Sequence, residues 1–73
     1  MALVDVPAPM SGTVMEVVVA VGDSVSQGDE LLILESMKME IPVESPESGK
    51  VAEILISPEQ KIEEGAPMLR LEV

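Results

Sequence analysis

The sequence contains no cysteine, histidine, phenylalanine, tryptophan or tyrosine. The lack of cysteine excludes disulfide bonds and thiol chemistry and fits a reducing compartment. The lack of histidine removes the most frequent general base and the commonest metal ligand. The acidic residues are scattered along the chain and do not have the alternating spacing of a calcium-binding loop. We therefore expect a protein that is not an enzyme and that holds no metal ion.

Positive charge is also scarce. Four lysine and arginine residues stand against fourteen aspartate and glutamate residues, which gives a net charge of −10. This charge repels nucleic acid and anionic membranes, and it makes a basic protein surface the natural partner. The longest apolar run, at residues 17–21, is too short to cross a membrane, and no signal peptide is visible. These features predict a cytoplasmic protein that binds neither nucleic acid nor membrane.

Aliphatic residues supply the material for a core. Hydrophobic residues make up 47% of the 73-residue chain, and without aromatic side chains the core must come from valine, leucine, isoleucine and methionine. This composition favours β-structure. Prolines at positions 42, 46, 58 and 67 interrupt the windows that could otherwise hold a helix. The sequence predicts one small all-β domain over residues 1–73.

The chain contains an internal repeat. When the sequence is shifted by 37 positions, residues 6–35 align with residues 43–72, and ten of the thirty pairs are identical. About two identities are expected between unrelated sequences. The shared positions are mostly turn residues and strand residues, so each copy predicts four short strands. We expect two halves, about 6–36 and 43–73, to share one core with approximate two-fold symmetry in a flattened β-barrel or sandwich.

The connector between the halves, the hairpin of residues 37–42, breaks a local rule. Hairpin turns are normally built from glycine, asparagine or aspartate, which tolerate positive φ. Here the turn falls within the stretch ESMKME, at Met37 and Lys38. Violations of this kind concentrate at functional sites. If the two halves are symmetric, the connector emerges at the end remote from the chain termini, and Lys38 points into solvent.

The neighbours of Lys38 support a functional interpretation. Lys38 is one of only four cationic residues and stands among acidic ones, and Met37 and Met39 flank it. Exposed thioethers often mark a recognition surface. The plainer alternative is an ordinary surface hairpin with a solvated lysine and methionines that reach the core. We interpret Met37 and Met39 as partly exposed contact residues.

The stretch ESMKME resembles the biotin attachment motif of biotinyl domains, whose core is Met-Lys-Met. The flanking stretches PAPMSGTV, VGDSVSQGDELLILE and SPESGKV resemble the rest of that domain, so the resemblance covers essentially the whole chain. It implies two four-stranded antiparallel sheets, with biotin joined by an amide to Lys38 through a separate biotin protein ligase. Met37 and Met39 would flank the lysine as recognition residues.

The resemblance also implies a function. The product would be a non-catalytic biotin carboxyl carrier that moves carboxylate between a biotin carboxylase and a carboxyltransferase or decarboxylase. The isolated domain is expected to be monomeric. Two alternatives stay open: a lipoyl carrier domain of a 2-oxo-acid dehydrogenase-type complex, and an unmodified interaction module. Lipoyl domains usually show Asp-Lys-Ala around the lysine, so Met-Lys-Met favours biotin.

Overall fold

The computed structural model describes residues 2–73, and within these residues all regular structure is β. The strands are β1 (Leu3–Pro7), β2 (Gly12–Val17), β3 (Ser24–Val25), β4 (Glu30–Ser36), β5 (Met39–Glu44), β6 (Gly49–Ile54), β7 (Lys61–Ile62) and β8 (Pro67–Glu72). No helix in this part of the chain is long and apolar enough to cross a membrane. The predicted all-β class is confirmed.

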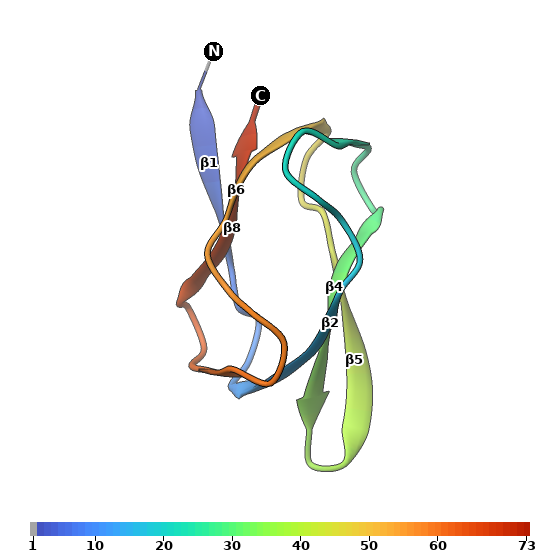
Figure 1. Ribbon diagram of the computed structural model, residues 1–73, viewed down its shortest axis with the longest axis vertical. Helices are drawn as coiled ribbons and strands as arrows, with labels where there is room; N and C mark the ends of the chain where they lie inside the picture. The colour runs from blue at the N-terminus through green and yellow to red at the C-terminus, as the bar shows by residue number, and fades with distance from the viewer. Residues whose placement is uncertain (1) are drawn as a thin grey trace.

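The strands form two four-stranded antiparallel sheets that face each other (Figure 1). One sheet has the order β1-β8-β6-β3, and the other has the order β5-β4-β2-β7. Neither sheet closes on itself. The architecture is therefore a sandwich of two open sheets, which is one of the two forms that the sequence predicted.

The two sheets are related by the sequence repeat. A shift of 37 positions converts β1, β2, β3 and β4 into β5, β6, β7 and β8, and it converts the strand order of one sheet into that of the other. Hydrogen bonds between the halves follow the same relation. The Oγ atom of Ser11 accepts from the N–H of Glu64 at 3.2 Å, and that of Ser48 accepts from the N–H of Gln27 at 3.1 Å. Each half thus secures a loop of the other half.

A single aliphatic core lies between the sheets. Ten of its thirteen buried residues form equivalent pairs from the two halves: Val6 with Val43, Val14 with Val51, Leu31 with Met68, Leu32 with Leu69, and Leu34 with Leu71. Burial of a side chain of this size contributes about 1.5–3 kcal/mol. Each sheet takes two strands from each half, so one half alone could form neither a complete sheet nor the core, and it would not be stable.

The symmetry places the β4–β5 turn and the chain termini at opposite ends of a molecule that is 36 Å long (Figure 1). Ser36 pairs with Met39 beside the turn, and the equivalent pair at the other end is Val73 with Ala2. The expected separation of connector and termini is confirmed. The turn itself takes up only Met37 and Lys38, since residues 39–42 already belong to β5.

Glycine is required where strands approach closely. A Cβ atom on Gly12 would lie 2.6 Å from the backbone oxygen of Glu35, and one on the equivalent Gly49 would lie 2.6 Å from that of Glu72. Backbone atoms cannot move aside as a flexible side chain can. These two glycines therefore allow β2 and β6 to begin against β4 and β8.

We predict that Gly49→Ala lowers the free energy of unfolding by about 1–3 kcal/mol, because the new methyl group forces a backbone shift. Gly49 lies near the chain termini, at the end of the molecule away from the turn. The substitution therefore tests stability without altering the turn. Urea unfolding measures the change. The control is Lys50→Ala at the next, exposed position, which should stay within about 0.5 kcal/mol of the parent chain. Equal stability of the two variants would contradict the close approach.

Candidate functional site

The β4–β5 hairpin leaves only two residues for its turn. The pairing runs from Glu30 with Glu44 to Ser36 with Met39. Met37 and Lys38 lie between and have φ angles of 52° and 64°. A two-residue turn of type I′ requires positive φ at both central positions, since its twist then matches the twist of the strands. The turn thus has the conformation of an Asn-Gly hairpin without either of those residues.

This conformation is costly for methionine and lysine. A residue other than glycine in the left-handed region costs on the order of 1–3 kcal/mol. The hairpin can hold it because β4 is anchored by Leu32 and Leu34, which are fully buried, and β5 by Val43. The pairing of β4 with β5 fixes both strands up to the turn. Met37 and Lys38 must therefore reverse the chain direction by themselves. The strain is therefore maintained by packing several residues away.

All three residues of the Met-Lys-Met stretch lie in solvent. Met37 is 92% exposed and Met39 is 63% exposed, whereas Met68 in the core is 0% exposed. Lys38 is exposed as well. The structure places the thioethers and the amine at one extremity of the sandwich, as the sequence predicted. Whether Met37 and Met39 serve in recognition stays a prediction.

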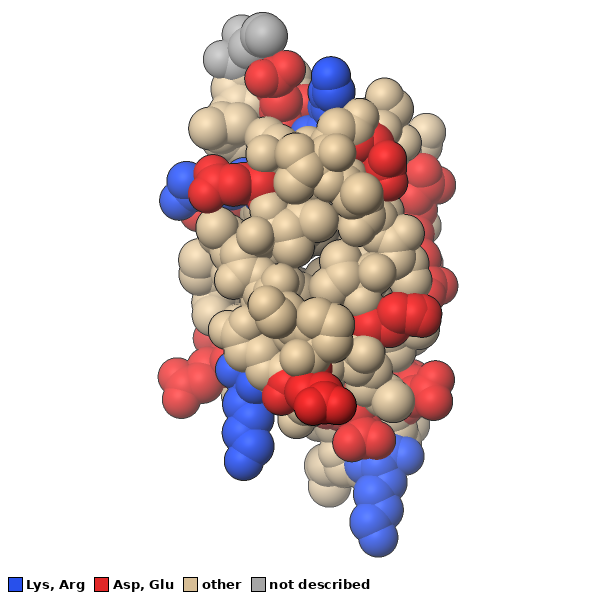
Figure 2. Space-filling model, in the orientation of Figure 1, with Lys and Arg blue, Asp and Glu red and all other residues tan. Residues whose placement is uncertain are grey.

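Charge is unevenly distributed around this end. The ion pairs found among residues 2–73 are those of Arg70, which bonds Asp5 at 3.0 Å and Glu53 at 3.4 Å. All three residues lie in the sheet that does not contain the β4–β5 hairpin. Glu35 and Glu40 face each other across the hairpin just before the turn, a like-charge pair that destabilises it. Basic side chains extend into solvent from the turn end, with acidic side chains around them (Figure 2). The amine of Lys38 is thus presented outward from an otherwise acidic body.

The site can present an amine but holds little that could activate it. No hydrogen bond of Lys38 occurs among the described residues, and no group of three or more histidine, cysteine, aspartate or glutamate side chains there could hold a metal ion. An acyl group on Nζ would form an amide and remove one positive charge. Because the side chain lies in solvent, this amide would displace nothing. The residues present therefore fit a cofactor that is attached through a carboxyl group.

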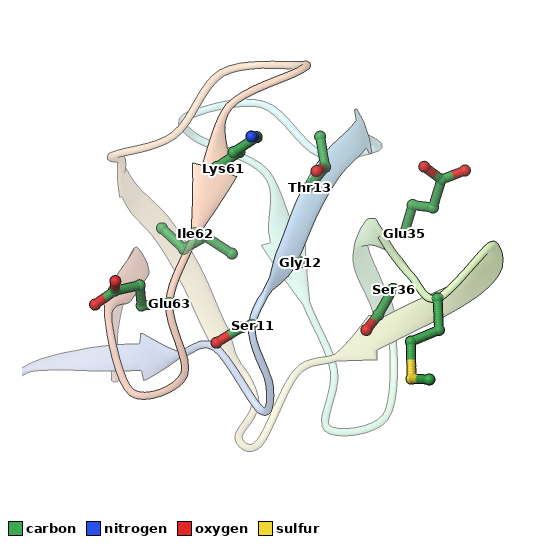
Figure 3. A pocket seen from close by; sticks show the side chains of 9 residues that line it. Ser11, Gly12, Thr13, Glu35, Ser36, Lys61, Ile62 and Glu63 are labelled. Carbon is green, nitrogen blue, oxygen red and sulfur yellow. The ribbon is translucent and has the colours of Figure 1, made fainter.

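A hollow beside the turn was not predicted from the sequence. It has a volume of about 780 Å³ and is open to solvent. Its lining comes from the start of β2, the end of β4 with Met37, and β7: Ser11, Gly12, Thr13, Glu35, Ser36, Met37, Lys61, Ile62 and Glu63. Figure 3 shows these side chains arranged around Gly12. The hollow depends on strand pairing between distant segments, and the only sequence signal for it is the glycine.

Comparison with known proteins places this site in a family. The family model described as "Biotin-requiring enzyme" matches residues 4–71. The chain belongs to this family. The resemblance to biotinyl domains is thereby confirmed over nearly the whole chain.

Relatives carry related names. A "Biotinylated protein TB7.3 homolog" of Mycobacterium leprae is 59% identical over 39 residues, which are 53% of this chain and 55% of that protein. A "Biotin carboxyl carrier protein" of Streptococcus mutans is 62% identical over 34 residues, 47% of this chain and 26% of that protein. The chain thus spans about half the length of the mycobacterial relatives it matches.

Solved structures share the fold. The urea carboxylase of Kluyveromyces lactis matches with a TM-score of 0.91 at 32% identity, over 99% of this chain and 6% of that one. A single-chain, multi-domain long-chain acyl-CoA carboxylase matches with a TM-score of 0.88 at 31% identity, over 93% of this chain and 7% of that one. In both cases the sandwich corresponds to a small part of a much longer carboxylase chain.

We predict that Met37→Gly raises the free energy of unfolding by about 0.5–1 kcal/mol. Glycine relieves a left-handed strain of roughly 1–2 kcal/mol and loses part of that gain through its more flexible unfolded state. Met39→Gly is the matched control, since Met39 is an exposed strand residue whose φ is not positive. It should lower the free energy of unfolding, and urea unfolding of both variants measures the difference. A shift of both variants in the same direction would show that the turn is not strained.

Proposed function

We propose that the chain is a biotin carboxyl carrier in which biotin is joined by an amide to the Nζ atom of Lys38. The observation that carries the proposal is the presentation of Lys38, exposed in a positive-φ turn between two exposed methionines, in a member of this family. Bound biotin supplies a ureido nitrogen that can carry a carboxyl group. The residues of the chain supply the position of that group and the surface around it.

Attachment of biotin requires an enzyme. In amide formation the Nζ–C bond forms, the bond to an activating group such as adenylate breaks, and the ammonium must first lose a proton. We find no group in residues 2–73 placed to take this proton, since Lys38 has no hydrogen-bond partner among them. We therefore propose a biotin protein ligase as the first partner, which provides both the activated biotin and the base. In this proposal the carrier itself performs no catalytic step.

The shape of the molecule suits delivery to two active sites. Lys38 lies at one end of a scaffold 36 Å long, so the turn can enter a partner's cleft while the body stays outside. We propose that these partners are a biotin carboxylase and a carboxyltransferase, in keeping with the multi-domain carboxylases that contain the same fold. Tethering keeps the cofactor at a high local concentration near both sites. The acidic body would attract basic catalytic domains.

We predict that Lys38→Arg abolishes biotinylation and leaves the fold intact, because arginine keeps the charge but does not form this amide. The measurement is intact mass after incubation with biotin, ATP and a biotin protein ligase. Lys50→Arg and Lys61→Arg serve as matched controls and should gain the mass of one biotin less one water. A gain of lipoyl mass in the native host, or of biotin mass on the Lys38→Arg variant, would contradict the proposal.

We predict that Met37→Ala and Met39→Ala each lower the kcat/KM of biotinylation about tenfold, as expected when a contact residue at an interface is truncated. Their free energies of unfolding should change by no more than about 0.5 kcal/mol, since both side chains are exposed. The control is Met15→Ala, because Met15 is 41% exposed and lies in β2 away from the turn. Unchanged ligase kinetics in the first two variants would remove the methionines from recognition.

A further inference from the structure

We infer that the hollow around Gly12 is a docking site for the biotin ring carried by Lys38 of the same chain. The inference rests on the proposed function, because it requires biotin on that lysine. The hollow begins at Met37, the direct neighbour of Lys38, and continues across β4 and β2 to β7. Its volume of about 780 Å³ lies in the range of about 300–1,000 Å³ that is typical of small-molecule sites.

The ring can reach Gly12 at the centre of the hollow. Glu35, Thr13 and Lys61 lie on one rung across β4, β2 and β7. Met37 and Lys38 lie side by side across the turn, with Lys38 on the β5 side. With about 3.3 Å per residue along a strand and about 4.8 Å between strands, this rung therefore extends from about 8 Å at Glu35 to about 16 Å at Lys61 from the Cα atom of Lys38, and Gly12 lies at about 10 Å. Eleven bonds separate that Cα atom from the ring in a biotinyl-lysine, so the extended arm measures on the order of 14 Å. The arm is therefore long enough to fold back and place its ring over Gly12.

The lining matches the chemistry of the ring. The ureido group has one carbonyl acceptor and two N–H donors, and the second ring is an apolar thioether. Ser11 already accepts a hydrogen bond from Glu64, so its own O–H is left to donate. The carboxylate of Glu63 can accept from the N–H groups. Met37 and the half-buried Ile62 offer apolar surface to the thioether ring.

The rung at this end carries its lysine on β7, as Lys61, whereas the equivalent rung at the other end carries its lysine on β6, as Lys50. The repeat places Ser24 at the equivalent position of the other half. Lys61 is exposed and forms no ion pair within residues 2–73, although the chain carries a net charge of −10. Its ammonium is free to donate to the ureido oxygen, and hydrogen bonds from a charged donor are about twice as strong as neutral ones.

Docking of a tethered ring needs only weak intrinsic affinity. A short flexible link gives an effective concentration in the millimolar range. A dissociation constant of the same order leaves the docked and free arms in comparable amounts. The hollow would then shelter the apolar ring between visits to partners, and it would release the ring readily because a partner site has only to bind more tightly.

Backbone amide NMR of the full chain tests the inference. The unmodified chain, the biotinylated chain and the Lys38→Gln variant are compared, and Lys38→Gln reports the effect of charge loss without a ring. Docking predicts that biotinylation shifts the amide signals of Gly12, Thr13 and Ile62 beyond the changes seen in Lys38→Gln. It also predicts nuclear Overhauser contacts between ring protons and the methyl groups of Ile62.

Two variants taken from the repeat sharpen the test. Lys61→Ser introduces the residue of the other half at this position, and Lys50→Thr does the same at the position equivalent to Thr13. Both remove one positive charge from an exposed strand residue. In the biotinylated chains, the shifts at Gly12 and Ile62 should fall at least about twofold in Lys61→Ser and persist in Lys50→Thr.

The outcomes separate the inference from the proposed function. Biotin on Lys38 by intact mass, with shifts confined to residues 36–40, overturns the docking and leaves the carrier function standing. Equal shifts in the two variants also overturn the role of Lys61. A chain that gains no biotin mass overturns the carrier function and the docking together.

Discussion

The pairing of β4 with β5 is the constraint on which the site depends. It runs up to Ser36 and Met39 and leaves two residues to reverse the chain, so Met37 and Lys38 must take left-handed conformations. Glycine would be cheaper at both positions, but it would supply neither an amine nor a contact surface. The energy that holds the turn comes from buried leucine and valine side chains farther along the strands. In the proposed function, stability and function thus depend on different residues of the same hairpin.

The pseudo-two-fold symmetry explains how a chain without aromatic residues supports such a turn. Each half contributes equivalent aliphatic residues to one core, and each half caps a loop of the other through Ser11 or Ser48. The symmetry ends at the extremities of the molecule. One end carries the covalent turn, and the equivalent place at the other end carries the paired termini, where Ala2 and Val73 exchange backbone hydrogen bonds. Met37 and Lys38, which are exposed and have positive φ, lie at one of these extremities.

Much of this structure follows from the sequence. The 37-residue shift, the aliphatic strands and the prolines predict eight short strands in two related halves, and the rule-breaking stretch ESMKME locates the turn. The open sheets could not be distinguished from a closed barrel, because closure depends on pairing between the edge strands. The hollow around Gly12 was missed for a similar reason: Lys61 meets Thr13 only through the pairing of β2 with β7. Local pattern predicts elements well, and it says less about distant segments that meet in space.

If a ligase modifies Lys38, as we propose, the backbone explains how one lysine of three can be selected. Lys50 and Lys61 are exposed amines too, so amine chemistry alone does not distinguish Lys38. Those two residues belong to paired strands, where the side chain stands on a sheet surface with neighbours on both sides. Lys38 occupies a two-residue turn at the extremity of the molecule, where a partner's cleft can surround the side chain. In this proposal the ligase selects Lys38 because its side chain is accessible on all sides. The conformational free energy of the left-handed turn is what makes this exposure possible.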